Sequence, residues 1–483
     1  MVLLNCVKEK EGQTALHRSG SCGSIDLLRQ LVEKSDDINL QDQRGQALLH
    51  QAGICGNECF IRILLEQGAN VNVQNRDGNT PLHLAGFCGN ECFVRILLEQ
   101  GANVNVQNTK GQTALHRSAP CGSVDLLRQL VEKSDDINLQ DQRGQTPLHQ
   151  AGFCRNECFI RILLEQGANV NVQNAEGKTP LHLVTSCGKV DLLRLLVEKS
   201  DDINLQDQDG NTPLHEAGFC GNECFVGILL EQGANVNVQN TRGRTALHLA
   251  ASRGTMDLLS LLVEKSADIN AQDQDGNTPL HEAGNECFVG ILLEQGANVN
   301  VQNTKRQTAL HRAASRGSMD LPRQLVKKSD DINLQDQDGN TPLHIAGFYR
   351  NECSIRILLE QGASVNVQNA KRQTALHRSA SCRSENLLRQ LVKKSDDINL
   401  QDQDGNTPLH EAGIIVNECF VGILLEQGAN VNVQNTEGQT ALHCSASCGN
   451  VDLLRQLVKK SDDINLQDQT YTIESKSSAT TTM

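Results

Sequence analysis

Histidine is the residue of this sequence best suited to acid–base or metal chemistry, because its ordinary pKa lies near neutrality. All fourteen histidines, however, belong to one recurring motif, Thr-(Pro/Ala)-Leu-His, or to its variant at Ala47–His50. Their positions are 17, 50, 83, 116, 149, 182, 215, 248, 281, 311, 344, 377, 410 and 443. Since every imidazole is committed to the same local pattern, none is left over for a catalytic triad or a metal site. We expect no catalytic residue and no enzyme activity.

Cysteine is the second candidate for chemistry, and its pattern also repeats. The spacing C-x-x-x-C recurs at Cys55/Cys59, Cys88/Cys92, Cys154/Cys158 and Cys220/Cys224. A zinc site usually needs four ligands, with thiolates about 2.3 Å from the metal, whereas each copy supplies two sulfurs. We therefore interpret the cysteines as reduced thiols, with zinc and a local disulfide as the alternatives. No glycine-rich phosphate loop follows a strand, so we expect neither a metal nor a cofactor.

The spacing of the marker histidines indicates how the chain is organised. Successive histidines are 33 residues apart, except that 281 and 311 are 30 apart. A fixed period of this length is typical of a solenoid, in which each unit is too small to bury its own apolar face and stacks on its neighbours.

The first part of each unit reads as a short helix. In the copy that begins at Thr80, the threonine hydroxyl can cap the helix, and Pro81 fits the first helical position because it lacks a donor there. Gly89 and Asn90 are expected to end this helix.

A second helix and a loop complete the unit. Cys92–Gln100 carries apolar residues at helical spacing, and Gly101 follows as the left-handed glycine that commonly ends a helix. The segment Ala102–Gly111 then predicts a β-hairpin finger that reaches toward the next unit.

These elements resemble the ankyrin repeat, whose G-x-TPLH-x-A, LLLE-x-GA and VN motifs recur over 12–469. The resemblance implies an all-α helical repeat solenoid of about fourteen units, with stacked helix pairs, β-hairpin fingers and a concave groove. It also implies that each marker imidazole forms hydrogen bonds with nearby finger backbone. Protein partners are what the family typically binds, through the finger tips and the ends of the first helices.

The composition is consistent with such a stack. The formal charge is −14, from 44 basic and 58 acidic residues, and a nucleic acid or an anionic membrane would require a basic face instead. No window approaches the roughly 18 apolar residues of a membrane span, and the apolar run at the N-terminus is too short for a signal peptide. We expect a cytoplasmic monomer that can also enter the nucleus. We expect it to bind proteins, and to bind neither nucleic acid nor membrane.

Two types of unit alternate along the chain, and one unit is short. The first type resembles 111–142 and ends its second helix with Ser-Asp, as at Ser134-Asp135, where the second type has Gly-Ala. Losing that glycine is expected to strain each such helix end by about 1 kcal/mol. The unit of His281 lacks three residues after Gly284. We predict a lead-in over 1–11, a first block over 12–280, an irregular repeat over 281–305, a second block over 306–469 and a disordered tail over 470–483.

Partner-binding residues are expected where otherwise similar copies differ. The finger tips vary in charge: after first-type units the residue before the turn glycine is Arg44 or Arg143, and then Asp in the later copies. Large apolar residues gather at the end of the first helix, although the chain has only 10 Phe, 2 Tyr and no Trp. Aromatic residues ringed by charges are typical of protein interfaces. The alternative for the apolar residues is packing between repeats. The alternative for the tips is a solvated surface whose sequence drifts. The candidates are Arg76, Asp77, Phe87, Lys110, Phe153, Asp209, Phe219, Arg242, Asp275, Lys305, Arg306, Asp338, Phe348, Tyr349, Lys371, Arg372 and Asp404, with Ile54 and Ile414 at the same helix end.

Some asparagines resemble sites of asparaginyl hydroxylation in ankyrin repeats, with Leu eight residues before and an acidic residue two before; the candidates are Asn39, Asn138, Asn204 and Asn399. The alternative is that these side chains only bridge the backbone of neighbouring fingers. For the whole chain, the leading hypothesis is a noncatalytic scaffold or adaptor. The second hypothesis is a regulatory or targeting subunit of an enzyme such as a phosphatase or a ubiquitin ligase.

Overall fold

The computed structural model describes residues 17, 25–35, 37–55, 57–121, 123–187, 189–253, 255–265, 268–461, 464 and 466–468. The predicted lead-in over 1–11 and the predicted tail over 470–483 lie outside these ranges. The chain divides into two compact units between Thr241 and Arg242, and each unit is described by itself.

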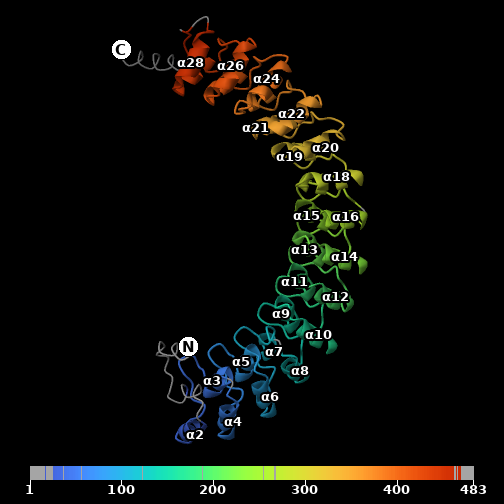
Figure 1. Cartoon of the computed structure of the whole chain (residues 1–483), viewed down its shortest axis with the longest axis vertical. Coiled ribbons are helices and arrows are strands. Elements are labelled where there is room, and N and C mark those ends of the chain that lie inside the picture. Colours follow the sequence, from blue (N-terminus) through green and yellow to red (C-terminus); the bar gives the residue numbers. More distant parts are fainter. Residues whose placement is uncertain are drawn as a thin grey trace, which may run out of the picture. The chain divides into compact units, whose positions relative to one another are not determined.

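Within each unit, helices follow one another in pairs, one pair to a repeat (Figure 1). In the first unit the helices are α2 Ile25–Glu33, α3 Leu48–Cys55, α4 Glu58–Glu66, α5 Pro81–Cys88, α6 Glu91–Glu99, α7 Ala114–Arg117, α8 Val124–Glu132, α9 Pro147–Phe153, α10 Glu157–Glu165, α11 Pro180–Cys187, α12 Val190–Glu198, α13 Pro213–Cys220 and α14 Glu223–Glu231. In the second unit they are α15 Ala246–Arg253, α16 Met256–Lys265, α17 Pro279–Glu282, α18 Glu286–Glu294, α19 Ala309–Ser315, α20 Asp320–Val326, α21 Pro342–Phe348, α22 Glu352–Glu360, α23 Ala375–Arg378, α24 Glu385–Lys393, α25 Pro408–Ile414, α26 Glu418–Glu426, α27 Ala441–Ser447 and α28 Val451–Val458.

The predicted caps set the helix boundaries. Helix α5 begins at Pro81 after the N-cap Thr80, and Gly89 ends it in the left-handed conformation at φ 72°. The side chain of Asn90 accepts a hydrogen bond from the backbone N–H of Phe93 and so caps α6. The predicted second helix is thus confirmed, with Glu91 in its first turn.

The core is a thin apolar layer that continues from one repeat to the next. In α6 the side chains of Phe93, Val94, Ile96 and Leu97 are buried, and the corresponding residues of the other second helices repeat this pattern. Each helix pair covers only part of its apolar face, so neighbouring repeats complete one another's core. The stacked helical array expected from the period is confirmed.

The fingers contain turns, and the expected β-hairpin strands are not seen. Across the described ranges the only strand-like pairing is an isolated bridge between Gln41 and Ala47. The finger at Gly78 closes with two backbone hydrogen bonds, from Asn75 N–H to the Asn79 carbonyl at 3.0 Å and from Gly78 N–H to the Asn75 carbonyl at 2.8 Å. These two bonds close a turn at the tip of the finger.

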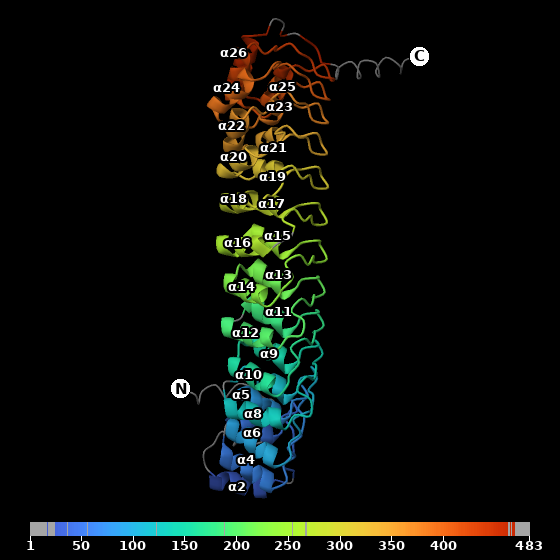
Figure 2. The same cartoon turned by 90° about the vertical axis from the view of Figure 1, so that its right-hand side faces the viewer.

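Glutamine side chains join successive fingers, which project from the same side of the helix pairs in each unit (Figure 2). In the first unit each of these amides donates to a backbone carbonyl 33 residues further on, over 2.8–3.4 Å. The donors are Gln41, Gln74, Gln107, Gln140, Gln173 and Gln206. Satisfying these exposed backbone groups fixes each finger against the next.

The first-type helix ends do not carry the expected backbone strain. Ser134 is not among the described residues with positive φ, whereas Gly101 at the corresponding place in a second-type repeat has φ 79°. The following Asp135 instead pairs with Asn105 of the preceding finger, whose Nδ2 donates to its carboxylate over 2.6 Å. The expectation of strain was wrong because a contact between repeats takes the place of the glycine.

The short repeat keeps both helices. Helix α17 has only four residues, Pro279–Glu282, and its C-cap Ala283 is extended. Helix α18 keeps its usual nine residues, and its Asn285 still caps it through the N–H of Phe288 at 2.9 Å. The deletion therefore leaves the second helix intact, and the first helix is as short as α7 and α23 in complete repeats.

Backbone strain is found instead at Val416, which has φ 60° in the turn where two second-type repeats have Gly89 and Gly221 and two others have Arg155 and Arg350 at φ 58°. A β-branched residue is disfavoured in this left-handed region by roughly 1–2 kcal/mol. We expect Val416→Gly to raise the free energy of unfolding by about 1 kcal/mol, because glycine's greater freedom in the unfolded chain offsets part of the relief. Urea denaturation measures the change, and Gly221→Val should lower stability as the matched control. A lower urea midpoint for Val416→Gly would contradict the assignment of strain.

Candidate functional site

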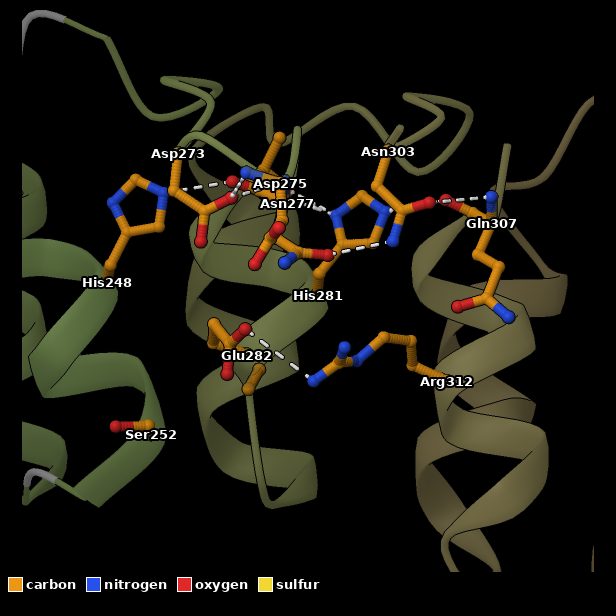
Figure 3. Close-up of polar contacts among 12 residues, drawn as sticks. His248, Ser252, Asp273, Asp275, Asn277, His281, Glu282, Asn303, Gln307 and Arg312 are labelled. Atoms are coloured by element: carbon orange, nitrogen blue, oxygen red, sulfur yellow. Dashed lines mark hydrogen bonds and ion pairs between the residues drawn. The ribbon is translucent and has the colours of Figure 1, made fainter. Parts of the chain in front are cut away.

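The marker histidines are structural and are held in one tautomer. In the repeat of His281, Nδ1 accepts from the backbone N–H of Thr278 at 3.1 Å, and Nε2 lies 3.0 Å from the Gln307 carbonyl (Figure 3). A carbonyl only accepts hydrogen bonds, so Nε2 carries the proton and Nδ1 does not. The same pair of contacts recurs at His83, with Thr80 and Gln112. The predicted hydrogen bonds to finger backbone are confirmed.

Burial keeps these imidazoles neutral. It lowers the pKa of His83, His149, His281 and His344 to about 4, although the carbonyl that each one faces works in the opposite direction. An imidazole that is buried, neutral and hydrogen-bonded on both sides has no free nitrogen to offer a substrate.

The cysteines described by the structure are free thiols. Those of the repeated pairs, such as Cys88 and Cys92, are exposed. No three His, Cys, Asp or Glu side chains among the described residues come together as metal ligands would.

The finger tips combine a fixed backbone with variable, exposed side chains. The carbonyl of Lys110 accepts from Gln142 N–H at 2.9 Å, and that of Asp209 accepts from Thr241 N–H at 2.9 Å. The same bond recurs along both units, so each tip is tied to the next finger through its main chain. The side chains of the predicted tip residues are exposed at every one of these positions, from Arg76 and Asp77 to Asp404. Charge can therefore vary at the tips without disturbing the stack.

Two tip arginines replace the turn glycine and take up its conformation. Arg306 and Arg372 have φ 56° and 58°, where the glycines at the corresponding turns have φ near 75°. A non-glycine residue pays roughly 1 kcal/mol for this conformation. Strain of this kind is often found where a side chain has a role beyond folding.

Large apolar side chains form a second exposed set, which we call the apolar row: Ile54, Phe87, Phe153, Phe219, Phe348 and Ile414. Each lies four residues after a marker histidine, at the end of a first helix, and is 45–69% exposed. First-type repeats have Ser or Pro at this position, as at Ser186. Packing between repeats, the alternative interpretation, therefore accounts for only part of each side chain.

Arginines that are not among the sequence-based candidates stack on two aromatic members of this row, Phe87 and Phe348. The guanidinium of Arg117 lies 4.4 Å from the ring centroid of Phe87, and that of Arg378 lies 4.1 Å from that of Phe348. Tyr349 meets Phe348 edge to face, with the ring centroids 5.2 Å apart. The sequence signal for these two contacts is an Arg directly after the marker histidine of the following repeat, 30 residues beyond the Phe, where Phe153 and Phe219 have Leu183 and Leu249.

Ion pairs connect the first helices and fingers of neighbouring repeats on the same surface. Lys178 lies 3.4 Å from Glu216, and Glu282 lies 3.5 Å from Arg312 (Figure 3). Arg244 approaches both Asp273, at 3.3 Å, and Glu282, at 3.9 Å. Much of the charge at the base of the fingers is therefore paired within the protein, in contrast to the exposed tips.

The structure brings only some of the predicted residues together. Lys110 and Phe153 line one cavity of about 500 Å³, and Arg242 and Asp275 line another of about 320 Å³. Phe348 and Tyr349 are in contact with each other. The remaining tip residues lie on successive fingers and do not form one cluster.

The four candidate asparagines bridge neighbouring fingers. The Oδ1 atom of each accepts the backbone N–H of a residue 31 positions further on, over 2.7–2.8 Å, from Asn70 in the case of Asn39. Hydroxylation at Asn39, Asn138, Asn204 and Asn399 stays a prediction. Mass spectrometry of protein isolated from cells should find a +16 Da shift on peptides that contain them, and unmodified peptides at all four would contradict it.

The sequence comparison agrees with this architecture. A family model described as ankyrin repeats (3 copies) matches 16–108, 88–174, 155–240, 220–303, 283–369, 349–415 and 376–468. No curated protein matches the chain. Among the described helices, none has both the length and the apolar character needed to cross a membrane. Because the family model matches nearly the whole described chain, this protein is a member of the ankyrin-repeat family.

Proposed function

We propose that the protein is a noncatalytic scaffold or adaptor that binds protein partners through its finger tips and the apolar row. Ankyrin repeats are generally protein–protein interaction modules. The observation that carries the proposal is the apolar row, with each member 45–69% exposed at the same place in its repeat. Half-exposed Phe side chains next to charged tips offer the apolar centre and polar rim of an interface.

The other parts of the proposal follow from the same surface. The marker histidines form hydrogen bonds with backbone of their own repeat and of the next one, as at His281. We therefore propose that the chain is a structural scaffold and that any catalysis belongs to its partners. We propose that it acts as a cytoplasmic monomer that can enter the nucleus, and that it binds neither nucleic acid nor membrane, in keeping with its net charge of −14.

Site-specific crosslinking in cells tests the proposal. A photoreactive phenylalanine analogue at Phe87, Phe153 or Phe348 should capture partner proteins, whereas the same analogue at Arg62 on the second helix α4 should not. Equal capture at both kinds of position would contradict binding through the apolar row. A catalytic subunit captured in stoichiometric amount would favour the alternative role, a regulatory or targeting subunit of an enzyme.

Charge at the tips is expected to govern association more than stability. Replacing Asp209, Asp275, Asp338 and Asp404 together by Lys should change the association rate of a captured partner and its salt dependence. The melting temperature should change little, because exposed charges contribute only about 0–1 kcal/mol each. Stopped-flow binding at two salt concentrations and calorimetry measure the two effects, and unchanged association kinetics would contradict the prediction.

A further inference from the structure

A cavity beside Phe153 lies on the proposed binding surface. It has a volume of about 500 Å³ and lies between two fingers and the end of α9. Phe153 is 69% exposed, the largest fraction among the exposed large apolar side chains of the structure as described. A cavity of this size can take a large side chain of a partner with its neighbours, since ligand sites range over roughly 300–1,000 Å³.

Most polar groups around the cavity are already committed to the fingers. The Oδ1 atom of Asp141 accepts from the N–H groups of Arg143, at 2.8 Å, and Gln145, at 2.9 Å. Its Oδ2 atom accepts from the side chain of Gln112 at 3.4 Å. The amide of Gln142 donates to the Thr109 carbonyl at 2.8 Å. The one carboxylate of the lining is thus occupied within the protein.

The two positively charged side chains that line the cavity, in contrast, have no partner among the described residues. Lys110 and Arg143 are exposed at successive tips, and among the described residues neither side chain forms an ion pair or a hydrogen bond. They flank a cavity whose apolar surface is the ring of Phe153. The site therefore offers one aromatic face and two unpaired positive charges, which together complement an apolar side chain next to carboxylates.

Resting on the proposed function, we infer that this cavity recognises a partner segment in which an aromatic or branched aliphatic residue is flanked by acidic residues. The apolar side chain packs against Phe153. The carboxylates pair with Lys110 and Arg143. This preference is opposite to what the net charge of −14 would suggest for the molecule as a whole.

The chain itself supplies the variants that test this inference. Sixty-six residues further on, the positions of Lys110 and Arg143 are held by Glu176 and Asp209. One repeat after Phe153, the same helix position is held by Ser186. Lys110→Glu with Arg143→Asp, and Phe153→Ser, therefore introduce only residues that the same fold already accepts at those positions.

Fluorescence anisotropy with the full chain is the experiment, using three labelled peptides that differ only in the residues flanking one Phe. The flanks are Asp-Asp on both sides, Lys-Lys on both sides, or Ser-Ser on both sides. We expect the acidic peptide to bind at least tenfold more tightly than the basic one, with a preference that weakens as salt is raised. The Lys110→Glu, Arg143→Asp variant should reverse the preference, and Phe153→Ser should weaken binding of the acidic peptide at least tenfold.

The outcomes separate this inference from the proposed function. If Phe153→Ser weakens binding but the charge reversal does not, the apolar row still binds partners and the inference about acidic segments is overturned. Absence of measurable binding of the acidic peptide at millimolar concentration also overturns it. So does equal competition by free N-acetylphenylalanine, which would make the cavity a small-molecule site. Circular dichroism of each variant confirms that the stack is intact.

Discussion

Between about pH 6.5 and pH 4 the protein is expected to lose several kcal/mol of its free energy of unfolding. Burial lowers the pKa of His83, His149, His281 and His344 to about 4, against an ordinary value of 6.5. In this pH range the histidines bind protons in the unfolded chain but stay unprotonated in the folded chain. Each of the four histidines therefore lowers the free energy of unfolding by ~2 kcal/mol at about pH 5, compared with neutral pH.

The direction of the effect follows from the sign of the shift. Because the folded-state pKa is below the unfolded one, the stabilisation is present above pH 6.5 and is lost as the pH falls toward 4. A proton on Nδ1 would also remove the acceptor for the threonine N–H, as at Thr278 and His281. Several further marker histidines have a pKa lowered by burial, among them His116 and His311, and they act in the same direction.

Urea unfolding followed by circular dichroism at several pH values between 7.5 and 4.5 measures this loss. Replacing His149 by Gln removes one titrating group and should reduce the pH dependence, even though the variant is less stable at neutral pH. NMR titration of the imidazole C–H signals gives an independent check. Marker histidines that become protonated near pH 6.5 while the fold persists would contradict the prediction.

The repeat period predicted most of this fold because helix caps and core positions are local features. Thr80 and Gly89 mark the ends of α5 in the sequence, and the structure places them there. The prediction of strain at the Ser134-Asp135 helix end is wrong because Asn105, which donates a hydrogen bond to the Asp135 carboxylate, lies 30 residues earlier in the chain. When a residue of a neighbouring repeat compensates for a local defect, the local sequence pattern does not reveal the contact.

The sequence predicts which residues belong to the candidate site, but not which of them lie close together. Exposure of the tips and of the apolar row follows from their place in the repeat, which the sequence reveals. The contacts between Arg117 and Phe87 and between Arg378 and Phe348 depend on how one repeat sits on the next. The cavity shared by Lys110 and Phe153 likewise involves two fingers and a helix of different repeats.

The short repeat illustrates the same compensation most clearly. In the complete repeat of α5, the Ala85 carbonyl accepts from the N–H of Asn90 at 3.0 Å, in the turn that follows the helix. The corresponding carbonyl in the short repeat belongs to Ala283, and the deletion has removed that turn. There the guanidinium of Arg316, from the next repeat, donates to the Ala283 carbonyl and approaches that of Glu282 at 3.4 Å. A cation is also favourable at the C-terminal end of a helix.

The sequence around this contact fits a role that is specific to the short repeat. Five residues after the marker histidine, first-type repeats have Cys, at Cys22, Cys121, Cys187, Cys382 and Cys448. Only the two repeats on either side of the short one have Arg there, at Arg253 and Arg316. We expect Arg316→Cys to destabilise the array by about 2 kcal/mol, the range for hydrogen bonds to a charged group. Arg316→Lys should retain part of this stability, because it keeps the charge and loses the planar fork.

Restoring Phe-Cys-Gly after Gly284 is expected to remove the need for Arg316. The inserted residues would rebuild the turn that satisfies the Ala283 carbonyl, so Arg316→Cys should have little effect in that background.

The short repeat is also expected to weaken coupling along the array, so that the predicted blocks over 12–280 and 306–469 unfold in separate transitions. Urea unfolding with one fluorescent probe in each block measures both effects: the insertion should bring the two transitions together, and Arg316→Cys should move them apart. Coincident transitions that neither change affects, or an equal loss from Arg316→Cys with and without the insertion, would show that Arg316 does not compensate for the deletion.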